Sequence, residues 1–160
     1  MLRPFDQPET AAIVAFLRGI GIPVAAEPLP DSFLPGLTVR DGGLVVDPER
    51  LKWPGDLLHE AGHIAITEPE RRPRLSAVSS DPGEEMAAIA WSWAAAAAIG
   101  LAPEIVFHAD FVGGSGNLID DFAAGYGVGV PMLVWFEMTV DRRAKEPGRA
   151  TFPEMARWLR

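Results

Sequence analysis

The residues best suited to chemistry are two histidines and a glutamate in one short stretch of the chain. His59 and His63 are four positions apart, and Glu60 directly follows the first histidine. On a helix, residues with this spacing share one face, so both imidazoles can bind the same metal ion. A glutamate beside the first ligand can deprotonate a metal-bound water. The spacing therefore predicts a metal-dependent hydrolytic site.

The sequence around this motif favours a buried helix. Residues 56–66 are largely apolar and contain no proline, and two of the three histidines in the chain fall here. Because the chain has no cysteine, any protein ligands must be histidine, aspartate or glutamate. Histidine combined with a carboxylate is typical of catalytic Zn²⁺. The alternative is a half-buried helix whose two histidines have only structural hydrogen bonds.

A catalytic zinc site usually takes a third protein ligand, and a glutamate on the following helix is the best candidate. The known spacing with a third histidine six residues after the second is excluded, because Pro69 occupies that position. Glu84 and Glu85 open a helix that Asp81 and Pro82 are suited to begin. Glu84 has a competing role as partner of Asp81 in a capping box, so Glu85 is the preferred ligand and Glu84 the alternative. Both acids also suit a helix N-terminus without any metal.

Two further side chains are candidates to stabilise the negative charge that develops on a carbonyl oxygen during hydrolysis. His108 follows a short apolar element and is also the second candidate for the third ligand, with a structural histidine as the alternative. Tyr126 is the only tyrosine and lies in a glycine-rich loop. Carboxylates often orient ligand histidines through their second nitrogen, and the candidates for that role are Asp110, Asp120 and Asp121.

The size and charge of the chain exclude several classes of function. Its 160 residues suffice for one domain with a hydrophobic core, which we place at 1–160. A net charge of −8 argues against direct binding to nucleic acid, which needs clustered basic side chains. No apolar run reaches transmembrane length, and the first residues lack a secretion signal. We therefore expect a cytoplasmic protein that binds neither membranes nor nucleic acid.

Apolar periodicity and turn signals predict an α+β fold with a small antiparallel or mixed sheet. Two β-rich runs, 37–40 and 44–47, are joined by Asp41-Gly42-Gly43, which is typical of a hairpin. A short strand is expected at 21–24. Helices are expected at 6–19 with Asp6 as its cap, at 56–67, 81–100, 117–124, 132–140 and 152–159, and a short helix or strand at 104–108.

This order of elements resembles the ImmA/IrrE family of zinc metallopeptidases. The resemblance rests on His59-Glu60-Ala61-Gly62-His63, on the preceding hairpin, and on the glutamate-led, alanine-rich helix that follows. It covers a core at residues 7–101 and implies a zincin-like fold of gluzincin type. In that fold His59, His63 and a glutamate hold Zn²⁺, and Glu60 is the catalytic base. Members often cleave repressor-type regulators. Residues 102–160 match no part of the family and are expected to form a helical C-terminal part.

Together these features predict a zinc-dependent metalloendopeptidase that hydrolyses peptide bonds in a protein substrate. Glu60 is expected to take a proton from the zinc-bound water and pass it to the leaving amine. The hairpin edge at 44–47 is expected to bind an extended peptide by strand addition. The alternatives are a non-catalytic zincin-fold module that binds or regulates a partner protein, and a closed structural zinc site.

Overall fold

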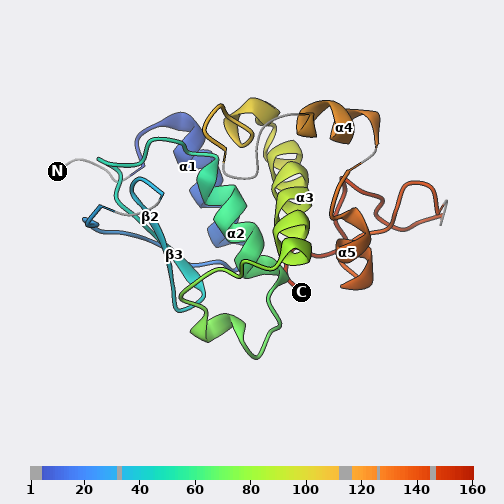
Figure 1. Ribbon diagram of the computed structural model, residues 1–160, viewed down its shortest axis with the longest axis horizontal. Coiled ribbons are helices and arrows are strands. Elements are labelled where there is room, and N and C mark those ends of the chain that lie inside the picture. The colour runs from blue at the N-terminus through green and yellow to red at the C-terminus, as the bar shows by residue number, and fades with distance from the viewer. Residues whose placement is uncertain (1–4, 32–33, 112–116, 126, 145–146) are drawn as a thin grey trace.

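The computed structural model describes residues 5–31, 34–111, 117–125, 127–144 and 147–160, and these form an α+β architecture (Figure 1). Helix α2 lies between the small sheet and α3, while α4 and α5 lie beyond α3. No helix among these residues is both long and apolar enough to cross a membrane. The elements in chain order are α1 (Pro8–Ile20), β1 (Val24–Ala26), β2 (Leu37–Arg40), β3 (Gly43–Val46), α2 (Asp56–Ile66), α3 (Pro82–Ile99), α4 (Leu118–Ala124) and α5 (Val130–Trp135), with 3-10 turns at Arg72–Arg74 and Pro103–Ile105.

The sheet has three strands in the order β1-β3-β2, so β3 is central and β2 forms one edge. β2 and β3 form the predicted antiparallel hairpin, and β1 adds to β3 in parallel. The prediction that 44–47 offers a free edge is wrong, because β3 is paired on both sides. The short strand expected at 21–24 begins only at Val24, since Gly21 closes α1 in a left-handed conformation with φ 99°.

The free edge of the sheet presents the backbone of Val39. The Leu44 N–H donates to the Pro23 carbonyl at 2.9 Å, so Leu44 directs its backbone groups towards β1. Val39 is the partner of Leu44 across the hairpin. The Asp47 N–H donates to the Gly36 carbonyl at 2.9 Å. The hydrogen-bonded pairs of the hairpin are therefore every second pair counted from Gly36 and Asp47, and the pair of Val39 and Leu44 is not one of them. Val39 therefore turns its N–H and C=O outwards, away from β3.

Helix α2 is buried along its whole length, which places the histidine motif in the core. All 11 of its residues are buried. It approaches α3 closely at Gly62, where an added Cβ would lie 2.8 Å from the Ala88 carbonyl oxygen. Only glycine permits this separation, because a side chain there would meet backbone that cannot rotate away. The small residues of α3 complete the contact and bring its first turn within reach of the two histidines.

Of the two predicted helix caps, the one at α3 is confirmed and the one at α1 is wrong. The Asp81 side chain caps α3 as predicted, accepting the Glu84 N–H at 2.9 Å. The Asp81 N–H donates to Ser79 Oγ at 3.0 Å, so Glu84 does not complete a capping box. At α1 the cap position is Gln7, which makes no side-chain cap hydrogen bond, and the predicted Asp6 cap is wrong.

The C-terminal part is less helical than predicted. The helix expected at 132–140 ends at Trp135, and Glu137 follows with a left-handed φ of 58°. The helix expected at 152–159 does not form, because its backbone groups bind other parts of the fold instead of one another. The Ala156 N–H donates to the Met138 carbonyl at 2.9 Å. The carbonyl of Trp158 accepts a 3.0 Å hydrogen bond from the Trp91 indole N–H, so Trp158 still docks on the body.

We expect Gly62→Ala to lower the free energy of unfolding by about 1–3 kcal/mol, because the new methyl group overpacks the contact with Ala88. Gly19→Ala is a matched control on the exposed surface of α1, where an added Cβ meets nothing within 4 Å. The free energy of unfolding of this control should rise by about 0.5–1 kcal/mol, because alanine has a higher helix propensity than glycine. Urea unfolding followed by circular dichroism measures both effects. Equal shifts in the two variants would contradict the close contact of α2 with α3.

Candidate metal centre

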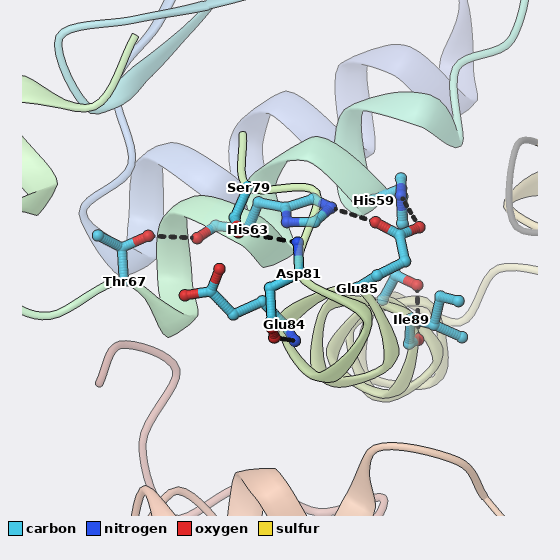
Figure 2. A network of polar contacts seen from close by, with 9 residues as sticks. His59, His63, Thr67, Ser79, Asp81, Glu84, Glu85 and Ile89 are labelled. Atoms are coloured by element: carbon cyan, nitrogen blue, oxygen red, sulfur yellow. Dashed lines mark hydrogen bonds and ion pairs between the residues drawn. The ribbon is translucent and has the colours of Figure 1, made fainter. Parts of the chain in front are cut away.

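Three side chains from two helices converge at the first turn of α3. The Nε2 atom of His59 lies 3.0 Å from Glu85 Oε1, and that of His63 lies 2.8 Å from Glu85 Oε2. One ligand atom from each of the three residues lies within 4.8 Å of the others. Figure 2 shows the carboxylate of Glu85 between the two imidazoles. The preferred ligand set is thus brought together in space.

The hydrogen bonding of the two imidazoles indicates whether a cation fits between His59, His63 and Glu85. His63 Nε2 is buried and makes no aligned hydrogen bond, although Glu85 Oε2 is only 2.8 Å away. A buried ring nitrogen without a hydrogen bond is costly unless its lone pair has another partner. The two imidazoles, His59 foremost, also hold the pKa of the Glu85 carboxyl well below its usual range, so this group is an anion. Two imidazole nitrogens and a carboxylate are a donor set that suits zinc.

Glu84, the alternative ligand, points to another region. Successive helix residues are rotated by about 100°, so the two glutamates cannot aim at the same point. Figure 2 shows the Glu84 carboxylate directed away from the imidazoles. It lines a neighbouring pocket of about 360 Å³ together with Arg71 and Ser79, and His63 borders this pocket as well. The expectation that a capping box occupies Glu84 is not met, but helix geometry still separates it from the histidines.

Glu60 lies in the same cleft as the three candidate ligands. This cleft has a volume of about 300 Å³ and is bounded by β2 on one side and by residues 76–78 on the other. Glu60 is only 8% exposed, and this burial raises the pKa of its carboxyl against the opposing effect of the two histidines. A carboxylate with a raised pKa is a stronger base, which suits a group that must accept a proton from water.

His108 does not face this cleft, which contradicts its predicted roles as a ligand or a transition-state donor. Its Nδ1 accepts the Asp110 N–H at 3.2 Å, so the ring proton is on Nε2. Nε2 lies 2.7 Å from Asp56 Oδ1 and donates to it. The ring also stacks on Trp53, with centroids 4.2 Å apart. Both nitrogens are therefore occupied in anchoring the start of α2.

The remaining predicted residues have no contact with the candidate ligands in the part of the chain that the structure describes. Tyr126 lies outside the described residues. Asp110 pairs with Lys52 at 3.0 Å, and no hydrogen bond joins Asp120 or Asp121 to a ligand histidine among the described residues. The carboxylate that sequence reasoning missed is Asp56, one turn before His59. Burial raises its pKa, although the hydrogen bond from His108 opposes this.

Comparisons with known proteins found no matching family model, no matching curated protein and no matching solved structure.

We expect Glu85→Gln to weaken zinc binding by at least about 100-fold, because it removes the anionic donor while keeping the shape of the side chain. Glu84→Gln is the matched control, one residue away on the same helix turn, and should bind zinc like the parent protein. Competition against a chromophoric zinc chelator measures both affinities. If Glu84→Gln weakened zinc binding more than Glu85→Gln, Glu84 would be the ligand.

Proposed function

We propose that this protein is a zinc-dependent metallopeptidase with a zincin-like core similar to that of the ImmA/IrrE family. The observation that carries the proposal is the convergence of His59, His63 and Glu85, with the buried Glu60 in the same cleft. Three protein donors leave a position for water or substrate, which distinguishes catalytic zinc sites from closed structural ones.

The residues of the cleft have separate roles in peptide hydrolysis. His59, His63 and Glu85 would hold the zinc ion, which would supply Lewis acidity to the scissile carbonyl and to water. Glu60 accepts a proton from the attacking water and returns it to the leaving amine, and its raised pKa favours the first of these transfers. His59 and His63 are held rigid because α2 is buried along its whole length.

The edge of the sheet supplies a place for the substrate backbone. β2 borders the cleft through Leu37, Thr38 and Val39, and Val39 directs its N–H and C=O away from the sheet. An extended peptide that pairs with this edge gains backbone hydrogen bonds irrespective of its sequence. The strand-addition hypothesis therefore applies to β2, in place of the 44–47 segment expected from sequence.

We expect Glu60→Gln to retain zinc and to lower peptide hydrolysis by about 10²–10⁴-fold, because glutamine cannot accept the proton from water. Cleavage of a fluorescently labelled, unfolded casein, with zinc content determined in the same sample, measures both properties. Glu84→Gln should leave both unchanged. A zinc-loaded parent protein that cleaves no unfolded protein or peptide would favour the non-catalytic binding module instead.

We expect Val39→Pro to raise the KM for an extended peptide by about tenfold, because proline removes the outward N–H of β2. Val39→Ala is the control, since it truncates the same side chain but keeps the N–H. Steady-state kinetics with an internally quenched peptide separate KM from kcat, and circular dichroism checks that each variant folds. An unchanged KM in folded Val39→Pro protein would refute pairing at this edge.

A further inference from the structure

A further pocket, distinct from the metal cleft and from the pocket beside Glu84, lies on another face of α3. It has a volume of about 360 Å³, within the range of small-molecule sites. Met86 and Trp93 of α3 form one wall, and residues 127–131, 141–143 and 152–153 form the others. The loop before α5 approaches α3 so closely that a Cβ on Gly129 would lie 2.0 Å from the Met86 carbonyl oxygen. Tight backbone packing of this kind gives the pocket fixed walls.

Aromatic rings form the interior of this pocket. Trp93 and Phe122 are stacked, with centroids 5.0 Å apart and planes 17° from parallel. The ring centroid of Phe152 lies 6.1 Å from that of Phe122. Two further apolar side chains of the lining, Met86 and Val128, are 40% and 36% exposed. A flat apolar group that entered here would stack on the rings and remove this surface from water.

The rim of the pocket carries two arginines and one aspartate, Arg142, Arg143 and Asp141. Arg143 is held by Asp141, whose Oδ1 accepts the Arg143 backbone N–H at 2.8 Å. Arg142 is exposed and makes no ion pair or hydrogen bond within the part of the chain that the structure describes. Its Nη1 lies against Gly125, where an added Cβ would be 2.6 Å away. The positive charge of Arg142 helps to lower the pKa of Asp141, but two arginines against one aspartate leave the rim with a net positive charge. In a chain of net charge −8, a positively charged rim beside an aromatic pocket favours an anionic ligand.

We propose that this pocket binds a small aromatic carboxylate, with the ring against Trp93 and Phe122 and the carboxylate on the guanidinium of Arg142. Guanidinium and carboxylate match in shape and form paired, charge-assisted hydrogen bonds. A wholly apolar ligand leaves Arg142 unused, and a cationic ligand is repelled by it. The site is independent of the metal centre and of the proposed peptidase activity.

Calorimetric titration of the zinc-loaded full chain with phenylacetate and with indole-3-acetate tests the proposal. Phenylacetamide and phenethylamine keep the ring but replace the anion with a neutral or a cationic group. We expect both to bind at least about tenfold more weakly than phenylacetate, as is usual when a hydrogen bond to a charged group is lost. Equal binding of the acid and the amide, or no binding of either acid at millimolar concentration, would overturn the proposal.

The same carboxylate chemistry occurs at the end of a peptide whose last residue is aromatic. N-acetyl-glycyl-phenylalanine, titrated as the free acid and as the amide, distinguishes this source from a free aromatic acid. Tighter binding of phenylacetate than of the peptide acid assigns the pocket to a small molecule, as proposed. Tighter binding of the peptide acid overturns that assignment.

Two variants locate the binding. Arg142→Gln removes the charge at an exposed position and should weaken phenylacetate binding about tenfold or more. Val128→Trp enlarges a side chain of the pocket lining and should abolish binding. Arg74→Gln, at an exposed arginine of the 3-10 turn Arg72–Arg74, is the control and should bind like the parent protein. Unchanged affinity in folded Arg142→Gln and Val128→Trp proteins would overturn the assignment to this pocket.

Discussion

The candidate metal centre depends on the close approach of α2 to α3. Gly62 allows the backbone of α3 to come near at Ala88, so no side chain separates the two helices at this point. Glu85 lies almost one turn before Ala88 and therefore reaches the face of α2 that carries His59 and His63. The distance between the donor groups is thus fixed by backbone packing. Donors held in this way need little rearrangement to bind an ion, which favours tight binding.

Burying a polar motif inside an apolar core has a cost that the surroundings must offset. Asp56, His59, Glu60 and His63 are all at most 8% exposed. Asp56 is compensated by His108, whose ring is in turn fixed by Trp53. Among the described residues, the two histidines of the motif have no comparable protein partner apart from Glu85, and the ring nitrogens His59 Nδ1 and His63 Nε2 lack hydrogen bonds. This imbalance distinguishes the candidate metal centre from the pair formed by Asp56 and His108 beside it.

Features set by local sequence could be predicted, and features set by distant contacts could not. The extent of α2, the hairpin and the Asp81 cap follow from spacing and turn residues, and all three occur in the structure. The parallel pairing of β1 with β3 and the irregular C-terminal segment depend on partners far along the chain. The role of His108 was wrongly predicted for the same reason, because its partner Asp56 is 52 residues away and a lone histidine carries no local signal.

The cap of α3 has a consequence for how other chains that carry this histidine motif are aligned with this one. Asp81 sets where the helix begins, and with about 100° between successive residues it also sets the direction in which Glu85 points. The connecting segment from 67 to 80 can therefore gain or lose residues while the donor keeps its direction. One insertion between Asp81 and Glu85 would turn the carboxylate away. An alignment that counts from the second histidine will misplace the glutamate whenever the segment changes length, whereas one anchored at the cap will not.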